Sequence, residues 1–569
     1  MSQKESQWIL AEMPEIPPGV GQGLPDILVR MMLQRQVKAE EMDQFLHPRL
    51  RNLQDPFLIP DMEVAVERIL QAVDSGEDVC VYGDYDVDGI TSVTLMTEVL
   101  SAYGSSVRCF IPRRGPEGYG LNEAALQRCM SEGYCPSLLI TVDCGTASID
   151  EIATLTKNGV DVIVVDHHEM PPQGKPDCVA VVNPKCSKTG TSEFEYLCAA
   201  GVVFKLAHAL LKTRKIDGFD LKNHLDLVAM ATVADIVPLV HENRLLVRHG
   251  LRLMENTKNH GIQALMDVAQ VKGPLTSADV GFRIGPRINA AGRMDKPEDA
   301  LATLRARSKE EANALASKLD SHNRERQGEE KRIHKDALAR LEAECNPDDP
   351  VIVLGSRDWH PGVVGIVASR MMRRFHKPAF IIAIDDKGVG KGSGRSIGGV
   401  SLMDAINANR DCLIAGGGHA MAAGISVHED QIETFRQGFS THVTENVRAH
   451  DRLPRLKLDV EIDFSELSLD FLKSYELLQP FGSGNSEPYF MTREVYLTEP
   501  PRELKNLHLK LSMKQKECWQ HAMFFGAAER ELPPQPWDIA FTINRNDFRG
   551  RTSLQIVIQD VRAHQSNND

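Results

Sequence analysis

Short apolar runs alternate with stretches of helical spacing over the first half of the chain. The runs Val79–Tyr82, Ser137–Val142 and Val160–Val165 are rich in β-branched residues, which is typical of buried strands. Between them, residues 90–103 carry apolar side chains at helical spacing, and a further helix is expected to end near Asn158. Strand and helix in alternation predict an α/β fold with a parallel, doubly wound sheet covered on both faces.

A long charged stretch separates this region from a second α/β pattern. Residues 296–345 are rich in Ala, Leu, Glu, Lys and Arg and hold no proline after Pro297, which predicts a long helix or helix pair acting as a solvated connector. The following pattern of strand, helix and strand, at 351–355, 363–374 and 379–384, predicts a smaller α/β domain.

The pattern changes again after Pro454. Hydrophobic and polar residues alternate in Leu456–Asp463, His508–Ser512 and Ser553–Ile558, as expected of half-buried strands in a small antiparallel barrel. The expected divisions are an N-terminal extension (1–60), a first α/β domain (61–295), the helical connector (296–345), a smaller α/β domain (346–450) and the barrel (451–569).

Composition excludes several classes of protein. The chain has 569 residues, of which 42% are hydrophobic and 25% charged, so it is neither collagen-like, disordered nor membrane-embedded. The N-terminus lacks a basic segment followed by an apolar one, and we expect a cytoplasmic protein with no membrane partner. Eleven cysteines without a Cys-x-x-Cys pair indicate reduced thiols rather than a zinc ribbon. The net charge of −14 neither supports nor excludes a nucleic-acid partner.

Acidic residues and histidines follow all of the first strand-like runs. They are Asp84, Asp86 and Asp88 after the first run, Asp143 after the second, and Asp166, His167 and His168 after the third. Parallel strands open these loops at the same carboxyl edge, so the side chains are expected to converge. Converging carboxylates repel one another, and a divalent cation relieves that repulsion. Carboxylate with some imidazole suits Mn²⁺ or Mg²⁺.

Asp235 extends this set. It is the only charged residue in the apolar helical run 228–237, and a buried carboxylate needs a partner. A buried salt bridge is the alternative, but the other acidic segments favour a metal ligand.

Asp84–Gly89 also matches the opening of a calcium-binding EF-hand loop. Position 12 of that loop is Leu95 instead of the required glutamate, and the segment follows a strand, so we exclude this alternative. One aspartate is expected to cap the helix that begins near Ile90, but three in five residues exceed what capping needs.

These motifs resemble, in order, the four motifs of the DHH phosphoesterase superfamily. They are Asp84-Tyr-Asp-Val-Asp-Gly89, Val142-Asp-Cys-Gly145, Asp166-His-His168 and Asp235. Gly416–Gly424 is similar to the signature of the associated DHHA1 domain. Three further segments narrow the resemblance, over about residues 60–560, to the bacterial single-strand-specific 5′→3′ DNA exonucleases: Gly285–Arg293, Trp359–Arg370 and Phe481–Pro488. One departure is Tyr82, at a position where many relatives have histidine.

The resemblance implies a DHH domain, a DHHA1 domain and an OB-like single-strand-binding barrel in the three expected domains. It also implies a pair of Mn²⁺ or Mg²⁺ ions that hold the scissile phosphate. Carried over by position, the ligands are Asp84, Asp86, Asp143, His167 and Asp235, with Asp88 ranked lower and Asp143 expected to bridge the ions. His168 would contact the phosphate or assist proton transfer. The implied partners are single-stranded DNA with a free 5′ end, a single-strand-binding protein and a helicase, with a monomer acting in recombinational and mismatch repair.

A 5′-phosphate suits arginine with small hydroxyl or backbone donors. Ser393, Arg395 and Ser396 resemble the family's end-binding segment, and Arg287 and Arg293 are further candidates between which the sequence does not choose. The substrate-binding set also includes Asn289, His360, Gly417, Gly418 and His419. The glycines are expected before a helix, where the backbone can approach a phosphate, with a tight turn as the alternative. His360, beside Trp359, is expected to stack on or contact the substrate; the alternative is that Trp359 is simply packed in the protein interior.

Two other functions fit parts of the pattern. A hydrolase of short oligonucleotides or cyclic dinucleotides would share the metal site, but such relatives are shorter and lack the barrel. A non-catalytic single-strand-binding scaffold would have eroded acidic motifs, whereas all of them are present. The chain has no Gly-x-x-x-x-Gly-Lys-Ser/Thr loop, which excludes one other common hydrolase type.

Overall fold

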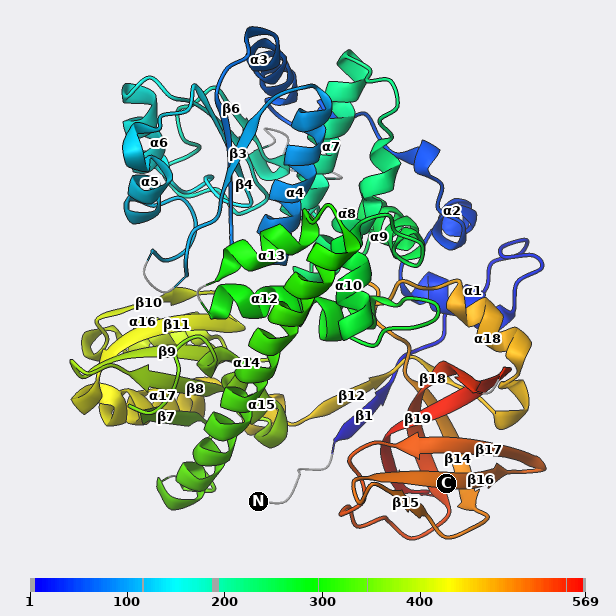
Figure 1. The fold of residues 1–569 in the computed structure, drawn as a ribbon. Coiled ribbons are helices and arrows are strands. Elements are labelled where there is room, and N and C mark those ends of the chain that lie inside the picture. Colours follow the sequence, from blue (N-terminus) through cyan, green and yellow to red (C-terminus); the bar gives the residue numbers. More distant parts are fainter. Residues whose placement is uncertain are drawn as a thin grey trace.

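The computed structural model describes residues 6–114, 117–186, 194–294, 296–344, 346–548 and 550–565. Figure 1 shows a sheet-containing lobe, a second smaller lobe beside it, and a barrel at the far side of a long diagonal helix. Within the described ranges, no helix is both long enough and apolar enough to span a membrane. The ten described cysteines are free thiols.

The first lobe is built on the predicted parallel sheet. Its five strands lie in the order β3 (Val107–Phe110), β2 (Val79–Gly83), β4 (Leu138–Val142), β5 (Asp161–Val165) and β6 (Ala180–Val182), and every pair is parallel. Strands β2 and β4 are buried along their whole length, because helices cover both faces. The covering helices include α3 (Met62–Ser75), α4 (Val87–Ala102), α5 (Glu123–Cys129), α6 (Ile149–Lys157) and α7 (Ala199–Thr213).

Tyr82 lies on the face of the sheet opposite Val79 and Val81, because side chains alternate along strand β2. Its hydroxyl donates a 2.9 Å hydrogen bond to the Gly120 carbonyl, and its ring stacks on Phe110 with centroids 5.1 Å apart. The tyrosine is therefore a packed core residue.

The remainder of the first lobe is helical. Helix α8 (Leu225–Ala234) packs on α4 and on α9 (His241–Met254), and α10 (His260–Val268) follows. A π-helical turn at Val280–Ile284 leads into α12 (Gly285–Arg293). Helix α13 (Pro297–Leu304) precedes the 36-residue helix α14 (Lys309–Glu344).

Helix α14 is not the solvated connector that its charged sequence suggests. It packs on α10, α12 and α13 of the first lobe and on α15 of the second, running diagonally between them (Figure 1). Its inner side is buried through Ala312, Ala316, Leu319, Ile333, Ala337 and Leu341. These residues are small or widely spaced, so the surrounding charge hides the apolar stripe in the sequence.

The second lobe contains a five-stranded sheet in the order β10 (Ala415–Gly418), β11 (Ala422–His428), β9 (Val389–Arg395), β8 (Ala379–Ile384) and β7 (Ile352–Ser356). Only β7 and β8 are parallel. Helices α15 (Val364–Phe375), α16 (Leu402–Ala408) and α17 (Ile432–Asn446) accompany it. The expectation that Gly416–His419 precedes a helix is wrong, because this segment turns directly into β11 as a hairpin.

The C-terminal sheet forms a partly closed barrel. Its order is β13 (Val460–Glu461), β14 (Phe490–Leu497), β18 (Trp537–Phe548), β19 (Arg551–Ala563), β17 (Cys518–Phe524), β16 (His508–Gln515) and β15 (Arg502–Leu504), and β14 also pairs with β16. Helix α18 (Leu469–Glu476) packs beside it.

The N-terminal residues join this barrel. Strand β1 (Gln7–Leu10) pairs in parallel with β12 (Arg455–Leu458), and the buried residues of α1 (Asp26–Gln34) belong to the same hydrophobic cluster as the barrel. The local sequence does not predict this pairing, because the two strands lie more than 400 residues apart. Helix α2 (Met42–Leu46) adds Met42 and Leu46 to that cluster.

Candidate active site and metal centre

The ends of strands β2, β4 and β5 bring the predicted acidic and histidine residues together. Their ligand atoms form three overlapping groups, each with all atoms within 4.8 Å of one another. The groups are Asp84, Asp86 and Asp143; Asp143, Asp166, His167 and His168; and Asp88, His167 and Asp235. Asp143 and His167 each belong to two groups, which places them at the centre of the cluster.

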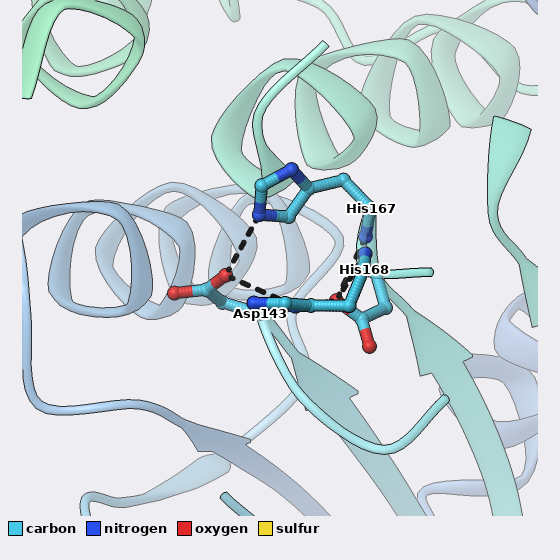
Figure 2. Close-up of side chains that lie close together, drawn as sticks. Asp143, His167 and His168 are labelled. Carbon is cyan, nitrogen blue, oxygen red and sulfur yellow. Dashed lines mark hydrogen bonds and ion pairs between the residues drawn. The ribbon is translucent and has the colours of Figure 1, made fainter. Parts of the chain in front are cut away.

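Asp143 is held in an unusual backbone conformation. Its φ of +61° lies in the left-handed region, which a residue with a side chain adopts only under constraint from its surroundings. Its Oδ1 lies 3.4 Å from Nε2 of His167 and 4.0 Å from Nδ1 of His168 (Figure 2). The strained turn thus aims the carboxylate at both imidazoles.

Asp84 has a buried carboxylate without a hydrogen-bond partner among the described residues. Burial and the negative charge of Asp86 raise the pKa of Asp84 well above its usual value. The turn that buries it requires Gly89, because a Cβ there would collide with the backbone of Asp84. An unpaired buried carboxylate is costly, and a divalent cation would satisfy it.

Asp86 and Asp88 also hold helices in place. Oδ1 of Asp86 accepts hydrogen bonds from the amides of Asp88 and Gly89 and so caps α4, as expected of one aspartate in this cluster. The Asp88 carboxylate accepts from the amides of Ala199 and Ala200, at 2.7 and 2.8 Å, in the first turn of α7. Each of its oxygens therefore already accepts one backbone amide, and Asp88 also belongs to one of the three ligand groups.

Asp235 ends helix α8 and points towards the histidines. Its Oδ2 lies 3.7 Å from Nε2 of His167, and no described Lys or Arg lies within ion-pair distance of it. Burial and the charges of Asp88 and Asp86 raise the pKa of Asp235 to about 8. The carboxylates thus carry the mutual repulsion that a bound divalent cation removes.

The two histidines are in opposite states. Burial and the charge of His168 lower the pKa of His167 to about 4, so its ring is neutral and can coordinate a metal; Nε2 is buried with no hydrogen-bond partner among the described residues. Burial disfavours the charged form of His168, but the hydrogen bond to Asp166 and the charges of Asp166, Asp235 and Asp88 together outweigh it, and the pKa of His168 rises to about 9. His168 is therefore a cation at neutral pH.

Asp166 and Tyr119 complete the environment of His168. Asp166 Oδ1 lies 2.7 Å from Nδ1 of His168, and the Tyr119 hydroxyl lies 2.9 Å from its Nε2. Asp166 also accepts hydrogen bonds from the amides of His167 and Thr146. No strand end or motif in the sequence marks Tyr119, so the predicted site lacks it. Asp166 belongs to a predicted motif, but the sequence assigns it no role of its own.

A basic pocket of about 700 Å³ lies where α12, α14, α15 and β9 meet. Arg293, Ser393 and Arg395 line it together with Arg114, whose guanidinium carbon lies 5.7 Å from the ring centre of Tyr85. Tyr85 lies between Asp84 and Asp86 in the chain, so the pocket adjoins the loop of residues 84–88, which we call the metal loop. Burial and the charge of Arg114 lower the pKa of Arg293 to about 10, and no described carboxylate pairs with it. Such an unpaired buried cation calls for an anionic ligand.

Other predicted substrate-binding residues lie elsewhere or have structural partners. Arg287 forms an ion pair with Asp320 of α14 and is not among the pocket residues, so the structure separates it from Arg293. Ser396 is buried and donates to the Val400 carbonyl. Asn289 accepts from the amide of Val87 and so supports the start of α4.

The second lobe presents its remaining candidates on exposed turns. His360 accepts from the Gly362 amide, and its neighbour Trp359 is 3% exposed and donates to Asp336, which confirms the packed-tryptophan alternative. Gly417, Gly418 and His419 lie in the β10–β11 hairpin. Glu169, which follows His168, forms a hydrogen bond with Lys185, and this bond lowers the pKa of Glu169.

The chain matches three known domain models. Residues 78–232 match the DHH family, N-terminal domain; residues 348–445 match the DHHA1 domain; and residues 458–560 match the RecJ OB domain. The single-stranded-DNA-specific exonuclease RecJ of Haemophilus influenzae is 32% identical over 96% of this chain and 98% of that protein. The corresponding Bacillus subtilis protein is 34% identical over 92% of this chain, which spans 66% of that longer protein.

Solved structures agree with the sequence comparisons. The crystal structure of RecJ from Thermus thermophilus in complex with Mn²⁺ matches 99% of this chain and 80% of that chain, with a TM-score of 0.83 and 28% identity. The Mg²⁺ complex of the same protein gives a TM-score of 0.78 and 27% identity. Mn²⁺ and Mg²⁺ are thus the ions that fit the buried, unpartnered ligand atoms of this site. On these matches, the chain belongs to the RecJ family of single-stranded-DNA-specific exonucleases, within the DHH phosphoesterases.

Proposed function

We propose that the protein degrades single-stranded DNA from a 5′-phosphorylated end, releasing 5′-mononucleotides. The observation that carries this proposal is the position of the pocket lined by Arg293, Ser393 and Arg395, next to the metal loop at Tyr85. An arginine pocket there can hold the terminal phosphate of a strand while the next phosphate lies at the metal cluster. This arrangement favours cleavage one nucleotide from the end.

We assign Asp84, Asp86, Asp143, His167 and Asp235 as the ligands of two Mn²⁺ or Mg²⁺ ions, with Asp143 between them. Its central position, shared by two of the ligand groups, supports this role. When bound, the ions supply positive charge to the scissile phosphate and its attacking and leaving oxygens. The protein's part is to hold these ligands in place through the Asp143 turn and the Asp86 cap.

His168 contributes a fixed cation. Asp166 keeps it protonated and orients its ring, and the ring edge that contacts Tyr119 is the more exposed one. A cation in this position stabilises the negative charge that develops on the phosphate oxygens. Asp88 supports the site without binding an ion, because its carboxylate joins the metal loop to the start of α7.

Degradation of labelled DNA tests this function. In Mn²⁺, single strands labelled near the 3′ end should shorten progressively, whereas strands labelled at the 5′ end should release labelled mononucleotide at once; matched duplexes should resist both. Arg395→Ala should abolish the preference for a 5′-phosphate over a 5′-hydroxyl, and Lys391→Ala, an exposed cation on the same strand outside the pocket, should preserve it. Turnover of di- or tetranucleotides without cleavage of long strands would instead identify a short-oligonucleotide hydrolase.

The cellular setting is a proposal that the family resemblance supports. It places the protein as a monomer in the cytoplasm, acting in recombinational and mismatch repair beside a single-strand-binding protein and a helicase. Co-purification of these partners with the catalytically inactive Asp143→Ala variant on single-stranded DNA would test it.

A further inference from the structure

The basic pocket carries more positive charge than a terminal monophosphate needs. Its lining includes seven cationic side chains and one acidic side chain, Glu330. The cations are Arg114, Arg293, Arg326, Lys331, Arg370, Arg373 and Arg395. Seven positive charges less one negative charge leave six, whereas a terminal phosphate near neutral pH carries about two negative charges. The volume of about 700 Å³ also lies within the range of roughly 300–1,000 Å³ that accommodates whole ligands.

One end of the pocket is the subsite proposed above for the 5′-phosphate. A Cβ built at Gly365, in the first turn of α15, would lie 2.9 Å from Ser393 Oγ and 3.5 Å from Arg395 Nη2. Arg293 donates a 2.8 Å hydrogen bond to the Gly362 carbonyl, just before the helix begins. The absence of a side chain at Gly365 thus leaves space between two donors and the start of a helix, which suits an anion.

The pocket continues from there along α15. Ser369 and Arg373 follow Gly365 at successive turns and line the same cavity. Eight residues of helix cover about 12 Å. Arg326 and Lys331 of α14 line the same cavity. A second group of cations therefore lies beyond the phosphate subsite, within reach of a ligand that extends along the helix.

The cations of this outer group lack sufficient acidic partners. Glu330 is shared between Arg326, at 2.7 Å, and Arg370, at 2.5 Å. Arg326 is only 9% exposed, yet its Nε has no hydrogen-bond partner among the described residues. Across the described chain, neither Arg373 nor Lys331 is joined to a carboxylate within ion-pair distance. The buried Nε of Arg326 is the unpartnered atom that a bound anion would stabilise, and the exposed Arg370, Arg373 and Lys331 add positive charge around it.

We propose that this outer group binds the β- and γ-phosphates of a 5′-triphosphorylated strand end. The α-phosphate would occupy the subsite of Arg293, Ser393 and Arg395, and the two outer phosphates would extend towards Arg326, Arg370 and Arg373. A 5′-triphosphate carries about four negative charges, closer to the six positive charges of the pocket. This inference rests on the proposed function, since it extends the same end-binding site.

The predicted chemistry changes only the first turnover. Water adds to the phosphorus that follows the first nucleotide, and the 3′ oxygen of that nucleotide leaves with a proton. The products are a nucleoside 5′-triphosphate and a strand with a 5′-monophosphate, which then enters the ordinary cycle. No other reactant is required.

The test uses the wild-type protein with Mn²⁺ and one DNA sequence made with a 5′-triphosphate, a 5′-monophosphate or a 5′-hydroxyl. We expect single-turnover release of nucleoside triphosphate from the first strand at a rate within about threefold of the monophosphate strand. Arg373→Ala combined with Arg370→Ala should slow the triphosphate strand at least about tenfold while leaving the monophosphate strand within about twofold. Arg374→Ala, a neighbouring cation outside the pocket, is the matched control.

Three outcomes would overturn the inference. In the first, the wild type degrades the triphosphate strand no faster than the hydroxyl strand. In the second, the double variant slows both phosphorylated strands equally. In the third, free deoxyadenosine triphosphate inhibits the enzyme at constant free Mn²⁺, but the triphosphate strand is not degraded. The last would assign the outer group to free nucleotides. Failure of the wild type to degrade the monophosphate strand would instead refute the proposed function itself.

Discussion

The backbone amide of Leu239 donates a 2.7 Å hydrogen bond to the carbonyl oxygen of Ser483. Leu239 lies four residues after Asp235, and Ser483 belongs to the Phe481–Pro488 segment that leads into the barrel. Arg244 and Arg248 of α9 tie the residues just before that segment, by donating to the carbonyls of Leu477 to Gln479. The segment therefore joins the barrel to the loop that follows Asp235, the proposed metal ligand at the end of α8.

Gly484 offers a way to disturb this connection. Its φ is +71°, and a Cβ there would lie 3.0 Å from Cβ of Pro238, three residues from Asp235. Gly484→Ala should therefore move the Asp235 loop, lower kcat about tenfold or more, and raise the Mn²⁺ concentration needed for half-maximal activity. Gly526→Ala is the matched control, since its φ is +72° with open space around it. Both variants carry a left-handed backbone penalty of roughly 1–2 kcal/mol, so equal loss of activity would show that strain alone is responsible.

Asp84→Asn should separate catalysis from stability. The substitution removes one of several mutually repelling buried carboxylates, so the metal-free variant is expected to melt at a higher temperature than the wild type. Added Mn²⁺ should stabilise the wild type by several degrees and the variant much less, because ligand binding to the folded state adds stability. Turnover should fall at least about a thousandfold. Thermal melts in EDTA and in Mn²⁺, with a nuclease assay, measure all of these. A variant less stable than the wild type in EDTA would contradict the repulsion argument.

The metal-free protein should lose stability as the pH rises from about 4 to 8. Burial and neighbouring carboxylates raise the pKa of Asp88 to about 7 and that of Asp235 to about 8, so the folded state holds these protons more tightly than the unfolded state does. Their contribution is complete below pH 4 and is lost as the pH passes through 7 and 8. Melting temperatures in EDTA at pH 6 and 8.5 should differ less in Asp235→Asn than in the wild type. Saturating Mn²⁺ should flatten the wild-type dependence, and an unchanged slope would count against Asp235 as a ligand.

Asp166→Asn should shift the alkaline limit of activity. The hydrogen bond and charge of Asp166 raise the pKa of His168 to about 9, and their loss should return it towards the ordinary value of about 6.5. In the role proposed for His168 the imidazolium is the active form, so the falling limb of the kcat profile should move down by about two pH units. His168→Gln should remove that limb altogether at a lower plateau. An Asp166→Asn profile of reduced height but unaltered shape would mean that Asp166 supports the fold without controlling His168.

The parallel sheet and most of the metal cluster can be predicted from the sequence alone. Strand-like runs end at Tyr82, Val142 and Val165, and in a parallel sheet the residues that follow must meet at one edge. The spacing of apolar residues and the end at which each strand stops are local properties, so they can be predicted from neighbouring residues. The resemblance added the expected ligand roles and the end-binding segment.

Which cations face the substrate, and how the parts are joined, depends on tertiary packing. Arg287 and Arg293 lie on the same short helix, yet one pairs with Asp320 and the other lines the pocket. The pairing of β1 with β12 and the contact of Leu239 with Ser483 join residues far apart in the chain. Such contacts depend on how whole elements pack, and no local pattern of hydrophobic and polar residues encodes them.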